Sequence, residues 1–357
     1  LFALKDTQPV KELAGRNVLL GRLLTTRPGI GMDPGRVGAA QIGLKAFTAR
    51  PVLGWGPENY SAAFDQFAPA EAFAHPQGFA RHGVYFDQAH AKPVEELTTK
   101  GVLGFLAYMS LWGLLFWVLV RGATTGRPQE ELFIFGMVGA LAGYFVQNLF
   151  LFDTPAPLLQ LMLLIGWVAS MESGAIFAFP LGHFARVRII NPAVATALLL
   201  LVLIVSVGMS VYFLNYRPYY SARAMHWVTT ITDTKRLSWN GRIALARQAI
   251  SQSPYLANYP RWLFFQQVAD NWTSLRFVEP FTILMLAESE GEKGLRAEPQ
   301  NVRLYVELAK VYQRAAVFDA GYLTKAAALA EEAKRLAPHR TQVQSLLGEQ
   351  RRLEGKQ

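Results

Sequence analysis

Three histidines and an aspartate stand in a polar segment near the start of the chain, and histidine can accept a proton near neutral pH. They are His75, His82, His90 and Asp87. The histidines lie seven and eight residues apart, a spacing that matches no compact metal-ligand motif, so we expect no metal site. Asp87 could fix the His90 imidazole if this segment is helical. On their own chemistry, these residues fit a solvated loop better than a catalytic site.

Arg36 is the second feature of this segment that could bear on chemistry. Arginine is always charged and can grip phosphate oxygens through two parallel hydrogen bonds. An arginine with a histidine at the outer face of a membrane therefore suits an anionic, phosphate-bearing lipid. The sequence has no nucleophile elbow, Walker loop or zinc-protease helix. It also has no cysteine, which excludes disulfides, thiol nucleophiles and cysteine-ligated metals.

Long apolar runs follow the polar segment, and the helices that they form must hold this segment in place. Hydrophobic residues make up 52% of the chain and charged residues only 17%, against about a quarter charged in soluble domains. The apolar residues gather in four runs, at residues 101–120, 132–152, 155–171 and 189–214. Each run can cross about 30 Å of hydrocarbon, the third being near the lower limit of length. The sequence thus predicts four membrane-spanning helices.

Arginines in the loops between these runs predict the orientation. They are Arg121 and Arg127 after the first run, and Arg186 and Arg188 after the third. The loop at 153–157 has no Lys or Arg, so the positive-inside rule places the arginine-bearing loops in the cytoplasm. Residues 1–97 and those after about 215 then lie outside the membrane. The net charge of +9 forms no concentrated basic stripe, which argues against nucleic-acid binding.

The last part of the chain has the apolar periodicity of helices. One unit resembles a tetratricopeptide repeat. Its first helix would carry Tyr305, Leu308, Ala309 and Tyr312, and its second helix Ala326, Ala330, Ala333 and Pro338, with five residues inserted between the helices. Small alanines let paired helices approach closely, and proline ends the second helix. A generic array of helical hairpins remains the alternative.

These patterns predict an all-α protein with three parts. Residues 1–97 form an extracytoplasmic loop with the candidate site, residues 98–215 form four transmembrane helices, and residues 216–357 form an extracytoplasmic tetratricopeptide-like domain. The sequence starts without Met and without a signal peptide, so we expect it to be a piece of a longer protein.

Three stretches of sequence resemble the O-antigen ligase family of bacterial membrane glycosyltransferases. They are RPVLGWGPENY at 50–60, FDQAHAKPVEELTTKGVLGFLAY at 86–108 and YFVQNLFLFDT at 144–154. The resemblance covers about residues 35 to 215. It implies a fold similar to C-type glycosyltransferases in the bacterial inner membrane. It also implies glycan transfer from an undecaprenyl-pyrophosphate carrier to a glycan, lipid or protein acceptor, without metal or cofactor.

The resemblance also implies roles for individual residues. The loop arginine of the family falls on Arg36, which would neutralise charge on the departing pyrophosphate. The loop histidine falls on His90, which would take the proton of the attacking acceptor or orient it. Substrate contacts would come from the same motifs. The residues concerned are Asp87, Lys92, Glu58 and Asn59.

Other functions are consistent with the same pattern. A polysaccharide polymerase and a protein O-oligosaccharyltransferase would share the donor and differ only in acceptor. A membrane-anchored scaffold would instead recruit a protein partner through the helical tail. Ala91 favours the scaffold, because family members usually have Asn directly after the histidine.

Overall fold

The regular elements of the described structure are all helices. The computed structural model describes residues 34–74, 79–80, 84–125, 128–171, 192–231, 236–252, 256–275 and 279–355. These ranges contain helices and turns but no strand, which confirms the all-α class. The chain divides into two compact units, Leu1–Met171 and Glu172–Gln357. The first unit therefore joins the polar segment to the first three apolar helices, and the fourth apolar helix goes with the C-terminal helices.

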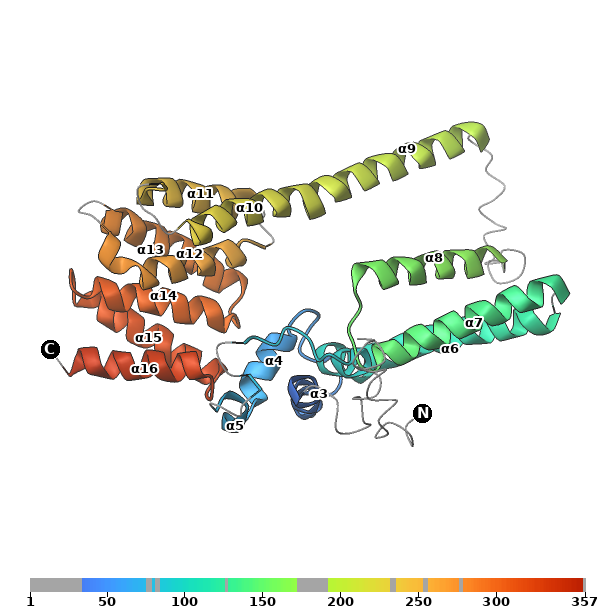
Figure 1. The fold of residues 1–357 in the computed structure, drawn as a ribbon, viewed down its shortest axis with the longest axis horizontal. Helices are drawn as coiled ribbons and strands as arrows, with labels where there is room; N and C mark the ends of the chain where they lie inside the picture. The colour runs from blue at the N-terminus through green and yellow to red at the C-terminus, as the bar shows by residue number, and fades with distance from the viewer. Residues whose placement is uncertain are drawn as a thin grey trace, which may run out of the picture. The chain divides into compact units, whose positions relative to one another are not determined.

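The first unit has a polar part and an apolar part. Its helices are α3 (Pro34–Phe47), α4 (Tyr60–Phe67), α5 (Ala70–Phe73), α6 (Lys92–Thr125), α7 (Pro128–Asn148) and α8 (Pro155–Met171). The long helices α6 and α7 lie side by side, and α8 also contacts α6 (Figure 1). Trp112, Leu141 and Leu164 are among the buried residues that join these three helices. Their outer faces remain apolar and exposed, as at Leu132 and Leu163.

Aromatic rings hold the polar part together. Phe64 of α4 stacks on Phe86 with ring centroids 4.8 Å apart, and it meets Phe73 edge to face at 6.3 Å. The buried Tyr60 hydroxyl donates a hydrogen bond to the Ala39 carbonyl of α3. Since α3 also packs against α6, this aromatic cluster fixes the segment before α6 onto the start of that helix.

The described part of the second unit begins with one long helix, which continues through a local irregularity. The helix comprises α9 (Pro192–Val211), a π-helical turn at Tyr212–Tyr216 and α10 (Arg217–Thr230). Pro218 has no N–H to donate to the carbonyl four residues earlier. The π-helical turn directly before it accommodates this lost hydrogen bond without ending the helix.

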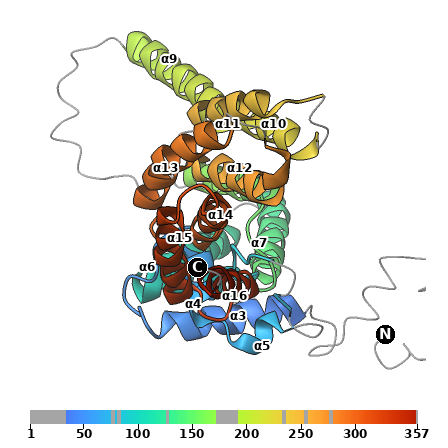
Figure 2. The same ribbon diagram turned by 90° about the vertical axis from the view of Figure 1, so that its left-hand side faces the viewer.

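Six further α-helices pack against α10 or against one another. They are α11 (Trp239–Gln252), α12 (Asn258–Asp270), α13 (Glu279–Ala297), α14 (Val302–Ala315), α15 (Gly321–Leu336) and α16 (Thr341–Glu354), with a short 3₁₀ turn at Trp272–Ser274. Neighbouring helices contact one another in chain order from α13 to α16 (Figure 2). Side chains of α10 to α14, with Ala326 of α15, form one buried core, and a second core joins α14, α15 and α16.

The helical pair predicted from the repeat pattern is present at α14 and α15. Leu308 and Ala309 of α14 are buried, as are Ala330 and Ala333 of α15. Residues 316–320 separate the two helices, in the part of the chain where the pattern required an insertion. Whether the array as a whole is a tetratricopeptide domain stays a prediction.

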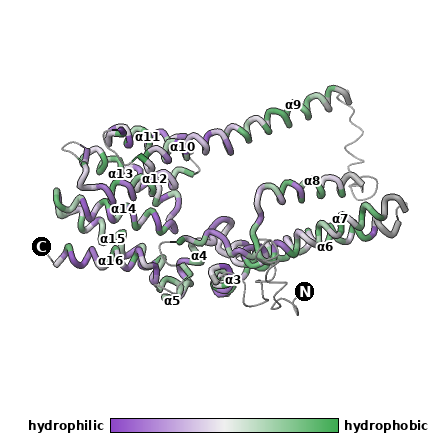
Figure 3. The backbone as a smooth tube through the Cα atoms, in the orientation of Figure 1, coloured by the Kyte–Doolittle hydropathy of each residue, from purple (hydrophilic) through white to green (hydrophobic). Residues whose placement is uncertain are grey.

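Two helical segments are long and apolar enough to cross a membrane. They are Lys92–Gly122 and Leu200–Thr230. Shorter apolar helices occupy Leu132–Asn148 and Pro155–Val168. In Figure 3, α9 is mostly hydrophobic, whereas α11 to α16 mix hydrophilic and hydrophobic residues. Two of the four predicted spans thus meet the requirements of length and composition.

Candidate functional site

The first predicted motif, at residues 50–60, is built around a break in α6. Gly101 has φ +66° and interrupts the helix, so the peptide groups on either side of it lose their partners in the helix. The motif supplies replacements. Trp55 and Gly56 donate their N–H groups to the Thr98 and Thr99 carbonyls at 3.0 and 2.7 Å, and the Pro51 carbonyl accepts from Val102 at 2.8 Å.

Two glycines allow the motif to approach the break so closely. Gly54 has φ +69°, and a Cβ atom there would lie 2.6 Å from the amide nitrogens of Lys100 and Gly101. A Cβ atom on Gly101 would lie against the Val52 carbonyl. Trp55 then anchors the motif, because its Nε1 donates to the Ala46 carbonyl of α3 at 2.9 Å.

His90 lies two residues before α6 in a conformation that few residues other than glycine adopt. Its φ is +54°, within the left-handed region. Its ring meets Phe86 edge to face, with centroids 6.0 Å apart, and lies 5.3 Å from the ring of Phe152. Because Phe152 belongs to the turn between α7 and α8, His90 connects the second and third predicted motifs.

Lys92 also connects the second and third motifs, through a backbone hydrogen bond and an ion pair. Its backbone N–H donates to the Leu151 carbonyl at 3.2 Å. Its ammonium lies 3.3 Å from Asp153 Oδ2 and 3.1 Å from Glu96 Oε1. Glu96 is buried and also accepts from Lys100 at 2.8 Å. The ammonium of Lys92 is thus held by carboxylates and is not free to reach into solvent.

Sequence reasoning did not assign Asp153 to the site. Its Oδ1 accepts hydrogen bonds from the Tyr144 hydroxyl at 2.6 Å and from Asn148 Nδ2 at 3.0 Å. Tyr144, Asn148 and Asp153 all belong to the third motif, YFVQNLFLFDT. The polar residues within this apolar run could have indicated the site, because polar groups in an apolar layer need hydrogen-bonding partners there.

The other predicted site residues lie apart from this network. Arg36 is exposed in the first turn of α3, and within the described ranges no hydrogen bond or ion pair joins it to another residue. Glu58 is exposed with φ +62°. Asn59, also exposed, precedes α4 and donates from Nδ2 to the Trp55 carbonyl at 3.2 Å. His75 and His82 are outside the described residues.

Asp87 does not meet the condition on which its predicted role depended. Residues 84–91 are not helical, and α6 begins only at Lys92. The spacing of three residues therefore does not place Asp87 beside His90 as a helical turn would. Asp87 is exposed. In the described part of the chain, no group of three or more His, Asp or Glu side chains is arranged to hold a metal ion.

Electrostatics support the view that carboxylates crowd the start of α6. Burial, together with the Glu95 carboxylate, raises the pKa of Tyr60 far above its ordinary value, so this phenol stays protonated. Glu58 and Glu96 also act on Glu95 through charge. The ammonium groups of Lys92 and Lys100 already pair with carboxylates here, and Arg36 remains the predicted partner for an anionic group.

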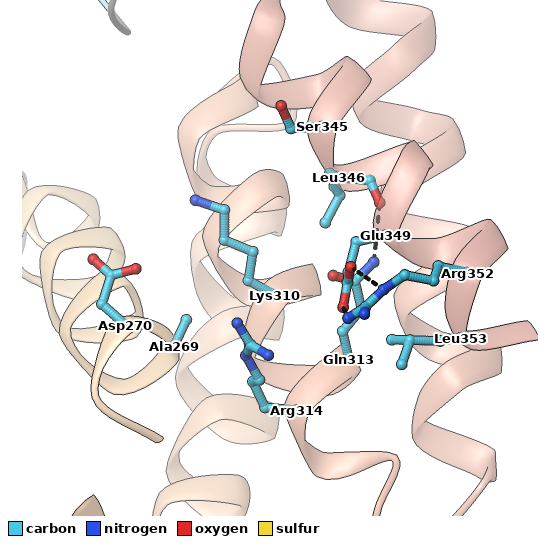
Figure 4. A pocket seen from close by; sticks show the side chains of 10 residues that line it. All are labelled: Ala269, Asp270, Lys310, Gln313, Arg314, Ser345, Leu346, Glu349, Arg352 and Leu353. Atoms are coloured by element: carbon cyan, nitrogen blue, oxygen red, sulfur yellow. Dashed lines mark hydrogen bonds and ion pairs between the residues drawn. The ribbon is translucent and has the colours of Figure 1, made fainter. Parts of the chain in front are cut away.

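A separate cavity of about 350 Å³ opens in the second unit between α12, α14 and α16 (Figure 4). Lys310 and Arg314 line it from α14, and Asp270 lines it from α12. On α16, Arg352 donates from Nε to Glu349 at 2.8 Å. Since the lining carries both signs of charge, it does not select an anionic substrate as the Arg36 segment would.

Comparison with known proteins adds no relative. No protein-family model matches the chain, and neither does any curated protein or solved structure.

Proposed function

We propose that this chain is part of a bacterial membrane glycosyltransferase of the O-antigen ligase type. One observation carries the proposal: the second and third motifs of the resemblance meet in space at the start of α6. His90 lies against Phe152, and Lys92 pairs with Asp153. Motifs that serve only to cross a membrane do not require a histidine and an ion pair at their junction.

The reaction would be a displacement at the anomeric carbon of a lipid-linked sugar. The acceptor oxygen attacks that carbon while the bond to the undecaprenyl pyrophosphate breaks. His90 accepts the acceptor's proton or orients the acceptor. Arg36 neutralises the departing pyrophosphate. Glu58 and Asn59 are exposed on the loop, and with Asp87 they can contact sugar hydroxyls. Lys92 pairs with Asp153, so its role toward the substrate is to hold Asp153 in place.

The proposed setting is the inner membrane, crossed by α6, α7, α8 and α9. The arginine-bearing loops face the cytoplasm, and the site and α11–α16 lie outside. The exposed apolar faces of α6 to α9 support this placement, because surfaces of this kind are covered by lipid or by other helices.

A membrane transfer assay on the protein tests the role of His90. His90→Ala removes the imidazole, but it also strains a backbone with φ +54°. His90→Gly removes the ring and tolerates that backbone, and His90→Asn retains a polar group that also adopts it. We expect all three variants to lose transfer while His90→Gly remains folded. Full transfer by His90→Gly would contradict the proposal.

The acceptor class is tested by glycan chain length after gene deletion. Loss of a ligase leaves lipid-linked polymer, whereas loss of a polymerase leaves single repeat units. A protein oligosaccharyltransferase would leave its protein acceptors unmodified.

A cluster of exposed aromatic side chains supports the membrane-anchored scaffold as a second candidate function. Phe318 lies 5.7 Å from Phe281 and 6.1 Å from Trp272, and the first two are about half exposed. Such a patch suits a protein partner. Removal of α11–α16 discriminates: a scaffold loses all function, whereas a transferase retains turnover.

A further inference from the structure

The second unit has no flexible linker between its apolar helix and its helical domain. The backbone runs from α9 through the π-helical turn into α10 as one helix. Arg217 at the start of α10 fixes the joint, because its Nη2 donates to the Ser251 carbonyl of α11 at 2.7 Å. The direction of α9 is thus set relative to α10 and α11 (Figure 1).

Hydrogen bonds show which end of the helical domain receives α9. The start of α10 lies beside the end of α11, since Ser221 donates to the Ala249 carbonyl at 2.8 Å. The end of α10 lies beside the start of α11, since Arg242 donates to the Val228 carbonyl at 2.6 Å. The end of α11 is therefore at the α9 end, and α12 starts there. Trp272, just after the end of α12, lies against Phe318 of the α14–α15 connection, so that connection is at the opposite end.

Exposed aromatic and apolar side chains lie at the α9 end of the helical domain. On the helix they are Tyr212, Tyr216 and Tyr219, which are 50%, 50% and 59% exposed. Near the start of α12 they are Leu256, just before the helix, and Tyr259, in its first turn, which are 49% and 52% exposed. We call these five residues the collar. Tyr212 stacks on Tyr216 with ring centroids 5.6 Å apart, so part of the collar is ordered without any neighbour outside the helix.

We infer that the collar rests in the headgroup layer of the membrane that α9 crosses, so that the helical domain sits directly on the lipid surface. The inference depends on the membrane location in the proposed function, but not on the transfer chemistry. Tyrosine suits this layer because its ring is apolar and its hydroxyl is hydrated. The twenty residues of α9 cover about 30 Å, the thickness of the hydrocarbon core. The collar follows at the depth where headgroups begin.

The absence of cysteine from the sequence allows a direct test by spin labelling. Single cysteines are introduced into the full chain at Leu256 and Tyr259 in the collar, at Leu203 in α9, and at Val317 at the opposite end. The protein is placed in vesicles of phosphatidylcholine with phosphatidylglycerol. Each label is probed with oxygen, which enters lipid, and with a nickel chelate, which stays in water.

We expect the Leu203 label to respond to oxygen and the Val317 label to the nickel chelate. The labels at Leu256 and Tyr259 should be several-fold less accessible to nickel than the Val317 label. If Leu203 lies in lipid but the collar labels match Val317, the inference is overturned while the α9 span stands. If Leu203 responds only to nickel, both the inference and the membrane location are overturned. Glycan transfer is measured separately and decides the proposed enzyme function.

Discussion

The ammonium of Lys92 lies 3.3 Å from Oδ2 of Asp153 and joins the first turn of α6 to the turn before α8. Both side chains are mostly buried, at 18% and 20% exposure. Glu96 approaches the same ammonium at 3.1 Å. Lys92 therefore neutralises the charge of carboxylates from two parts of the first unit. Without it, these negative charges would repel one another.

Lys92→Met should destabilise the protein more than Asp153→Asn. The methionine removes the cation shared by Glu95, Glu96 and Asp153, whereas the amide oxygen introduced by Asp153→Asn can still accept from Tyr144. We expect a loss of about 2 kcal/mol for Lys92→Met, the scale of a hydrogen bond to a charged group. The free energy of unfolding in detergent provides the measurement. The double variant should lose less than the sum of the single variants, and strict additivity would contradict a direct interaction.

Gly101→Ala should destabilise the first unit through the helix break. A positive φ costs a residue with a Cβ about 1–2 kcal/mol, and the new methyl group would meet the Val52 carbonyl. Gly113 is the control on the same helix, since nothing lies within 4 Å of its Cβ position. Thermal unfolding should show a lower midpoint for Gly101→Ala only. A lower midpoint for both variants would indicate a general effect of alanine in α6.

Arg36→Lys should reduce transfer without changing stability. The ammonium keeps the charge but cannot make two parallel hydrogen bonds to one phosphate group. Arg36 is exposed in α3, so the thermal midpoint should stay the same. Lys45→Ala provides the control, because Lys45 is an exposed cation in the last turn of the same helix. The turnover number and KM should be measured for each variant, and equal transfer by both would exclude Arg36 from the site.

Sequence pattern predicted the helical class, the apolar runs and the α14–α15 pair. Each of these follows from local periodicity, as the buried Ala330 and Ala333 illustrate. The break at Gly101 was not predicted, because a glycine within an apolar run also suits close helix packing. Only the approach of residues 51–56 from elsewhere in the chain distinguishes the two roles.

The site, like the break at Gly101, is formed by residues that lie far apart in the sequence. Asp153 and Lys92 are joined by folding and not by spacing, so neither residue predicts the other. Residues 84–91 are also not helical, and their sequence alone did not show that Asp87 would lie away from a helical turn with His90. Sequence resemblance brought His90 and Lys92 into consideration, but not the carboxylates that surround Lys92.

Ala330→Leu should destabilise the second unit by overpacking. Ala330 is fully buried between α14, α15 and α16, and extra methylene groups in a packed core cost about 1–3 kcal/mol. Ala328→Leu is the control, because Ala328 is exposed on the same helix. The midpoint of thermal unfolding should fall for Ala330→Leu alone. Equal midpoints would mean that α14 and α15 do not pack closely in solution.

Acid should weaken the contact between α12 and α13 through Glu290. Burial raises the pKa of this carboxyl, but hydrogen bonds and charge from Lys293 and Arg261 outweigh burial and hold the pKa below its ordinary value. Arg261 donates to Glu290 Oε2 from Nε at 3.0 Å and from Nη2 at 2.7 Å. A lowered pKa in the folded state means that this stability is present above the unfolded pKa of about 4.3 and is lost as the pH falls through the folded value.

Glu290→Gln should therefore lower the thermal midpoint at neutral pH and flatten its fall below about pH 5. The amide cannot pair with the Arg261 and Lys293 charges, and it does not titrate. Glu292→Gln is the matched control, since Glu292 and its partner Arg296 are both 67% exposed, and such surface pairs contribute little. Midpoints are measured across the acid range for the three proteins. If Glu290→Gln retains the full acid dependence of the unaltered chain, another carboxyl controls it.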